Sequence, residues 1–177
     1  MIASLTGVLE TVAEDFAVVD VSGVGYLVFC SGRTLANLPQ PGEPVRFVVE
    51  THVREDHINL YGFAEAGERD WFRLLTSVQG VGAKVALAIL SAIGSEELIQ
   101  AVAAQDKTVV SRANGVGPKL AGRIVLELKD KVGGLVPSAL SSTSLRGAAS
   151  SGDESEEAIS ALVNLGFQRT DAFGAVV

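Results

Sequence analysis

The sequence has little of several features that would place it in particular protein classes. Cys30 is its only cysteine, which excludes an intrachain disulfide and a cysteine-based zinc site. Its apolar runs are all shorter than the roughly 18–20 residues of a membrane-spanning helix. The opening residues, MIASLTGVLETVAEDF, lack the basic start and continuous apolar stretch of a secretory signal. From these absences we expect a cytoplasmic protein with no membrane segment.

Basic residues are also scarce, with 14 Lys and Arg against 21 Asp and Glu and a formal net charge of −7. The distribution of this charge matters more than its sum. Residues 1–64 contain three basic and eight acidic residues, and residues 136–177 contain two and five. Residues 65–135 contain nine basic and eight acidic residues. Any surface for a polyanion is therefore expected in the middle of the chain.

Residues 1–64 have the pattern of a small β-domain. Five short β-branched or aromatic segments are separated by turn signals such as Ser22-Gly23-Val24-Gly25 and Pro39-Gln40-Pro41-Gly42. Residues 54–57 form a third turn, which joins the last two segments as a hairpin. Five strands in about 60 residues predict a closed barrel of the OB-fold type, with one helical turn near residues 34–38.

At Glu65 the hydrophobic period changes from that of a strand to that of a helix. Helices are predicted over residues 67–78, 83–92, 95–104, 106–113 and 118–131. Ser95, followed by Glu96 and Glu97, is predicted to cap the third of these helices.

The last part of the chain differs again in composition. Residues 135–153 are rich in serine and glycine and are predicted to be a flexible linker. Residues 154–177 predict an amphipathic helix that Gly166 ends, followed by a second short helix from Thr170 or Asp171. Two short helices are fewer than a domain of this size needs, so its expected third helix is missing at Val177.

A short glycine loop occurs twice, 35 residues apart: Gly80-Val81-Gly82-Ala83-Lys84 aligns with Gly115-Val116-Gly117-Pro118-Lys119. The first glycine permits a positive φ, and the valine can turn inward. The second glycine opens a helix whose first N–H groups are unpaired, which is a general anion site. Lys84 and Lys119 lie just inside these helices, with Arg123 one turn beyond Lys119. We predict that each loop binds a phosphate of a nucleic-acid backbone.

Other interpretations of the loops differ in how well they fit. The spacing is not that of a Walker loop, and a helix rather than a strand precedes the glycines, against a dinucleotide-binding fingerprint. A base-excision glycosylase needs a catalytic aspartate, and Asp106 lies at a suitable distance from Gly82, although its surroundings predict a helix cap. His52 and His57 have no cysteine or serine partner in a nucleophile arrangement. Glycines that only make turns, or an adaptor that binds no DNA, remain alternatives.

The loop pattern resembles the tandem helix-hairpin-helix motif, which holds DNA backbone without reading bases. With the segments HVREDHINLYGF, NGVGPKLAGRIVLELKDK and EEAISALVNLGF, essentially the whole chain resembles the RuvA family of Holliday-junction-binding proteins. This resemblance implies an α+β multidomain protein that binds four-way DNA junctions of any sequence and catalyses no reaction itself. It implies no cofactor and no metal.

The resemblance also implies partners. The family forms homotetramers, one or two of which hold an open junction. They recruit the hexameric RuvB ATPase for branch migration in recombination and DNA repair, including the SOS response to DNA damage. A RuvC-type junction resolvase is a further implied partner.

Four parts of the chain receive roles from this resemblance. Residues 1–64 form the oligomerising barrel, 65–134 the DNA-binding tandem motif, 135–153 the linker, and 154–177 a partial, UBA-like helical domain for motor contact. The implied phosphate-binding residues are Gly80, Val81, Gly82, Lys84, Gly115, Val116, Gly117, Lys119 and Arg123. Glu55 and Asp56 match the family's acidic pin, which would repel phosphates from the centre of a four-fold tetramer. Leu162, Leu165 and Phe167 fall at motor-contacting positions.

Overall fold

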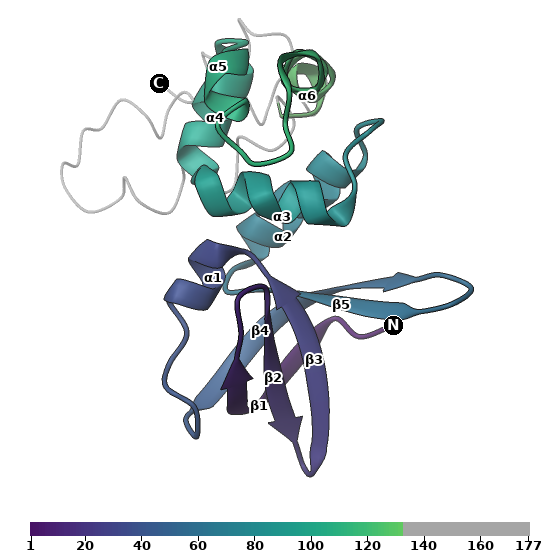
Figure 1. The fold of residues 1–177 in the computed structure, drawn as a ribbon, viewed down its shortest axis with the longest axis vertical. Coiled ribbons are helices and arrows are strands. Elements are labelled where there is room, and N and C mark those ends of the chain that lie inside the picture. The colour runs from purple at the N-terminus through teal and green to yellow at the C-terminus, as the bar shows by residue number, and fades with distance from the viewer. Residues whose placement is uncertain (133–177) are drawn as a thin grey trace, which may run out of the picture. The chain divides into compact units, whose positions relative to one another are not determined.

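The computed structural model of the chain describes residues 1–132 (Figure 1). These residues form a β-barrel followed by a helical region. The predicted linker and the predicted helical tail, including Leu162, Leu165 and Phe167, lie outside the described residues.

The barrel has five strands, as predicted: β1 (Ser4–Val12), β2 (Phe16–Val21), β3 (Val24–Cys30), β4 (Pro44–Val53) and β5 (Ile58–Phe63). They close in the order β1-β2-β3-β5-β4. The pair β3 and β5 is parallel and the other pairs are antiparallel. The predicted helical turn is α1 (Gly32–Ala36), which begins two residues earlier than expected and connects β3 to β4. The closed barrel confirms the predicted fold of this region.

Gly7 of β1 lies close against the backbone of β2. A Cβ at Gly7 would lie 2.1 Å from the carbonyl oxygen of Asp20 and 2.9 Å from Cγ1 of Val19. In a closed barrel the strands cannot separate freely, so we expect Gly7→Ala to lower the free energy of unfolding by about 1–3 kcal/mol. Thermal unfolding followed by circular dichroism measures this change. Gly67→Ala, where nothing lies within 4 Å of the new Cβ, is the control, and equal losses in both variants would contradict the prediction.

The helical region contains α2 (Ala66–Thr76), α3 (Ala83–Ala92), α4 (Ser95–Ala103), α5 (Lys107–Val110) and α6 (Pro118–Val132). The prediction that Ser95 caps α4 is wrong. Gly94 is the N-cap, in extended conformation, and its carbonyl accepts the Leu98 N–H at 2.9 Å. Glu96 and Glu97 do lie in the first turn. The helix α5 is shorter than predicted because residues 111–113 already turn into the following loop.

Aromatic side chains join the barrel to α2. Tyr61 and Phe63 of β5 belong to the same buried cluster as Trp71 and Phe72 of α2. The ring centroids of Tyr61 and Phe72 lie 4.9 Å apart, within the usual range for aromatic pairs. The helical region therefore shares its core with one face of β5.

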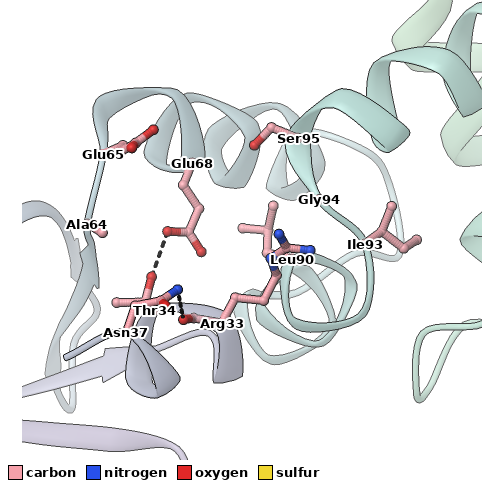
Figure 2. A pocket seen from close by; sticks show the side chains of 10 residues that line it. All are labelled: Arg33, Thr34, Asn37, Ala64, Glu65, Glu68, Leu90, Ile93, Gly94 and Ser95. Carbon is pink, nitrogen blue, oxygen red and sulfur yellow. Dashed lines mark hydrogen bonds between the residues drawn. The ribbon is translucent and has the colours of Figure 1, made fainter.

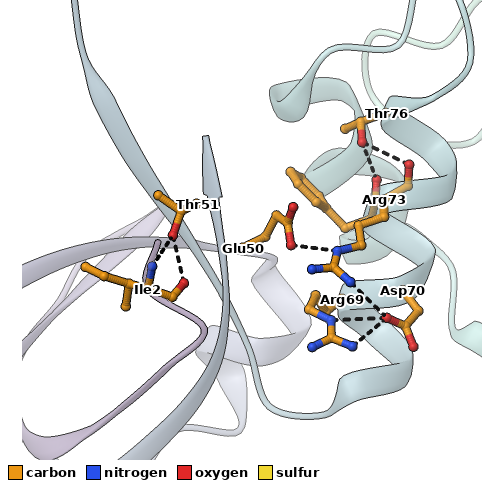
Figure 3. Close-up of polar contacts among 8 residues, drawn as sticks. Ile2, Glu50, Thr51, Arg69, Asp70, Arg73 and Thr76 are labelled. Carbon is orange, nitrogen blue, oxygen red and sulfur yellow. Dashed lines mark hydrogen bonds and ion pairs between the residues drawn. The ribbon is translucent and has the colours of Figure 1, made fainter. Parts of the chain in front are cut away.

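Polar contacts join the same two parts and are more directional. The buried Ser31, just before α1, donates a hydrogen bond to the Glu68 carboxylate of α2 at 2.5 Å. The buried Thr34 of α1 donates to the same carboxylate at 2.6 Å (Figure 2). On another side of α2, Nε of Arg73 lies 2.6 Å from a carboxylate oxygen of Glu50 in β4 (Figure 3). Together these contacts fix how α2 is oriented on the barrel.

The thiol of Cys30, at the end of β3, is buried, with 3 % of the residue exposed. Burial raises the pKa of this thiol from its ordinary value of 9.0 to about 12. Because the thiolate is the nucleophile, we expect alkylation of the folded protein by iodoacetamide at pH 8 to be at least about 100-fold slower than in denaturant. Mass spectrometry over time measures both rates, and similar rates would contradict the buried placement.

The raised thiol pKa also determines whether alkaline pH raises or lowers the stability of the folded protein. The unfolded thiol loses its proton near pH 9, whereas the folded thiol keeps its proton until about pH 12. Within this window the folded state binds more protons, so its stability falls as pH rises. Cys30→Ala should weaken this dependence.

Candidate nucleic-acid interface

The two glycine loops have matching backbone hydrogen bonds, so the repeat in sequence is also a repeat in structure. Three bonds in one loop have counterparts 35 residues later, with lengths that agree within 0.2 Å. In the first loop the N–H groups of Val78, Val81 and Ala86 donate to the carbonyls of Leu75, Val78 and Gly82; in the second, those of Ala113, Val116 and Ala121 donate to the carbonyls of Val110, Ala113 and Gly117.

Glycine is required at the first position of each loop. Gly80 has φ +93° and Gly115 has φ +82°, in the left-handed region that side chains with a Cβ disfavour. The valines that follow, Val81 and Val116, are both buried at 6 % exposure. Each loop is thus anchored inward by its valine and keeps its glycines at the surface.

The two hairpins pack against each other reciprocally. A Cβ at Gly80 would lie 3.4 Å from Leu120, and a Cβ at Gly115 would lie 3.9 Å from Val85. Val85 and Leu120 are themselves equivalent in the repeat. Exchange of equivalent contacts indicates an approximate two-fold relation between the hairpins. The loops are consequently held as a pair, each at the start of a helix.

Each loop offers backbone donors and a lysine at the start of its helix. Gly82 is the N-cap of α3 and makes no side-chain capping bond, so the first N–H groups of α3 are free to bind an anion. Lys84 and Lys119 are both exposed. Among the side chains that the structure describes, neither lysine forms an ion pair. The second loop offers one N–H fewer, because Pro118 has none.

Arg123, predicted to contact phosphate, has a structural contact that the sequence analysis missed. Its Nη1 donates to the backbone carbonyl of Gln79 at 3.2 Å, and its Nε lies 3.9 Å from Glu127. Nζ of Lys131 also donates to Oγ of Ser77, at 2.9 Å. Both contacts tie α6 to the segment just before the first loop. The side chain of Arg123 is still 49 % exposed, so it remains accessible to DNA.

A groove of about 940 Å³ runs beside the loops. Lys84, Arg112 and Asn114 line it from the helical region, whereas Glu14 and Asp15 line it from the barrel. Arg112 and Asn114 were not predicted as site residues. They lie immediately before the second loop, 35 residues after Ser77 and Gln79, which lie immediately before the first loop. Their place directly beside the repeated loop is the signal that would have identified them. Arg112 also forms an ion pair with Glu97.

The predicted acidic pin lies at the tip of the β4–β5 hairpin, which projects away from the rest of the barrel (Figure 1). The Arg54 N–H donates to the His57 carbonyl at 2.9 Å and closes the turn. Glu55 is exposed, and the Asp56 side chain is 81 % exposed, with one oxygen 2.7 Å from Nδ1 of His57. Two carboxylates at an exposed tip fit the predicted position of a pin, and their role stays a prediction.

Asp106, the aspartate of the glycosylase alternative, caps α5 as predicted. Its carboxylate accepts the Thr108 N–H at 2.8 Å, and this hydrogen bond lowers the pKa of the carboxyl group. A carboxylate that caps a helix and whose pKa is lowered is a poor candidate for a catalytic acid or base. Within the described residues no cluster of three side chains suits a metal ion.

Comparison with known proteins agrees with this geometry. The RuvA N terminal domain family matches residues 1–62, and the SAM-like helix-hairpin-helix tandem family matches residues 72–130. The chain is 57 % identical to the Holliday junction branch migration complex subunit RuvA of Paramagnetospirillum magneticum, across 99 % of this chain and 86 % of that protein. The corresponding subunits of Xanthobacter autotrophicus and Rhodospirillum centenum are 52 % and 53 % identical, with 99 % of this chain and 87 % of each relative covered. This chain belongs to the RuvA family.

Membership of the RuvA family confirms the resemblance inferred from the sequence, and the fold class with it. The family match over residues 72–130 includes both glycine loops. Among the described helices of this RuvA-family chain, no single one is long and apolar enough to cross a membrane. The helices α3 and α4 meet such a criterion only as a pair bent by 101°.

Proposed function

We propose that this chain binds four-way DNA junctions without regard to sequence, as the DNA-holding subunit of a branch-migration complex. The observation that carries this proposal is the pair of equivalent loops, held reciprocally, in a chain of the RuvA family. Its curated relatives are named as subunits of the Holliday junction branch migration complex.

The loops act on the DNA backbone in this proposal. Free N–H groups at the start of α3 and α6 bind one phosphate each, and Lys84 and Lys119 neutralise part of its charge. Such contacts position the DNA and carry no base information, which suits a protein that must act on junctions of any sequence. Arg123 supports the first loop through its hydrogen bond to Gln79, and its exposed side contacts the DNA backbone.

The barrel assembles four copies around the junction. Apolar side chains exposed on β1 and β3 support such an assembly, since Val8 and Leu27 are 43 % and 44 % exposed. Four-fold symmetry would bring the tips of the β4–β5 hairpins together at the centre. There the carboxylates of Glu55 and Asp56 repel phosphates and keep the arms apart.

The chain holds the DNA and leaves the chemistry to a hexameric RuvB-type ATPase. The predicted motor contacts Leu162, Leu165 and Phe167 are part of this proposal. A RuvC-type resolvase is a second proposed partner, which would act on the junction while the tetramer holds it open.

A competition gel shift tests the proposed function. A labelled four-way junction is bound by the protein at a stated salt concentration and challenged with unlabelled junction or with linear duplex of equal length and composition. We expect the duplex to compete at least about 100-fold less well, whatever the sequence of the arms. Equal competition by both DNAs would mean that the protein binds DNA without preference for a junction, and it would contradict the proposal.

A further inference from the structure

The β4–β5 hairpin carries an apolar pair that nothing in the described structure covers. Alternate residues of a strand face the same side, and in β4 the inward residues Val45, Phe47 and Val49 are buried in the barrel core. The same inward series continues to Val53, which is 69 % exposed. In β5 the residues on the same face are the buried Leu60 and, nearer the hairpin tip, Ile58, which is 66 % exposed. The core face of the hairpin thus extends beyond the barrel.

Val53 and Ile58 form one surface because they pair directly across the two strands. The opposite face of the hairpin is occupied, since the ring of His52 lies 4.9 Å from that of Tyr61 and 5.5 Å from that of Phe72. On the inward face the N-terminal segment of the chain covers the hairpin only as far as Thr51. Its Oγ1 accepts the Ile2 N–H at 3.0 Å and donates to the Ile2 carbonyl at 2.7 Å (Figure 3).

The neighbouring charges indicate what this pair meets. Glu55 and Asp56 follow Val53 by two and three residues, and both carboxylates are exposed. They disfavour a phosphate nearby, whereas the flat face of a base is uncharged and largely apolar. A protein interface covers about 800 Å² on each side, and these two aliphatic side chains supply only a small part of such an area, so the pair does not by itself define a protein interface. Of these occupants, DNA bases fit the surface best.

We propose that Val53 and Ile58 pack against the faces of the bases that flank the crossover of a bound junction. The proposal rests on the proposed function and extends it to a second task for the hairpin. The acidic tip repels the DNA backbone, and the apolar pair behind the tip packs against bases that have unstacked. Aliphatic side chains serve in the same way as wedges between base steps in proteins that bend DNA.

The test combines Val53→Thr with Ile58→Thr and a junction that carries 2-aminopurine beside the crossover. Threonine keeps the branched shape and strand preference of valine, and both sites are exposed, so the barrel should fold. Val24→Thr is the control, because Val24 is also an exposed valine, 54 % accessible, beside a hairpin turn of the same barrel. Fluorescence reports unstacking of the base analogue, and gel shifts report affinity.

We expect saturating wild-type protein and the Val24→Thr variant to brighten the 2-aminopurine equally. The double variant should lose at least half of this increase and bind the junction within about three-fold of wild type, since the loops carry affinity. Full brightening with the double variant, or none with wild type, would overturn the proposal. A changed assembly mass of the double variant in sedimentation would assign the pair to a contact between copies and also overturn it. Equal binding of junction and linear duplex by the wild-type protein would instead contradict the proposed function.

Discussion

Replacing Lys84 and Lys119 together by alanine is expected to weaken junction binding about 100-fold or more at moderate salt. Each lysine is exposed at the start of a helix whose free N–H groups lie beside it. A hydrogen bond to a charged group is worth about 1.5 kcal/mol or more, so removing two of them gives a factor of this size. The plot of log affinity against log salt should become shallower by about one for each phosphate that is no longer neutralised.

The matched control for this variant is Lys107→Ala with Lys129→Ala. It removes the same charge from two exposed positions outside the loops. We expect a change below about three-fold, because these lysines lie outside the loops and salt screens exposed charges that do not contact the DNA. Equal weakening in both double variants would mean that net charge alone attracts the DNA. Unchanged binding without Lys84 and Lys119 would mean that the loops are only turns.

Replacing Glu55 by glutamine and Asp56 by asparagine is expected to leave junction binding as tight as in wild type or several-fold tighter. Both side chains are exposed at the hairpin tip, and their removal takes away repulsion without breaking a buried contact. Branch migration driven with the proposed RuvB-type ATPase should nevertheless become abnormal, because strands could then settle at the centre of the proposed tetramer. Gel shifts measure the first effect, and strand-exchange assays on a four-way junction measure the second.

The control for the hairpin variant is Glu10→Gln with Glu65→Gln. It makes the same change of charge at exposed positions away from the tip. This control should bind junctions normally and support normal branch migration. Weaker junction binding by the hairpin variant, with the control unchanged, would contradict the role of Glu55 and Asp56 as a pin.

The features that the sequence predicted well have local causes. Strand and helix follow from the spacing of apolar residues, which set the five strands and the main helices within a few positions. The paired loops were predictable because the glycines and the inward valines repeat together, and a repeated glycine indicates a backbone position with a positive φ, as found at Gly80 and Gly115. Asp106 was likewise predictable as a cap, from its place directly before a helical segment.

The features that the sequence did not predict depend on residues far apart in the chain. Gln79 meets Arg123 across 44 positions, and Ser31 meets Glu68 across 37. Such pairs arise only when the helices have packed. The misplaced cap of α4 has a local cause, because Gly94 adopts the extended conformation of an N-cap without any side chain. The uncovered pair Val53 and Ile58 looks like ordinary strand in the sequence, and only the barrel shows that the core ends before it.

Hydroxyl-radical footprinting of a four-way junction bound by the wild-type protein tests the central claim most directly. If each chain of an assembly holds DNA backbone through its two loops, protected sugars should face each other across the minor groove on every arm. These protections should lie at the same distance from the crossover on all four arms and should not change with arm sequence. Protection of a single arm, or equal protection along linear duplex, would contradict the account.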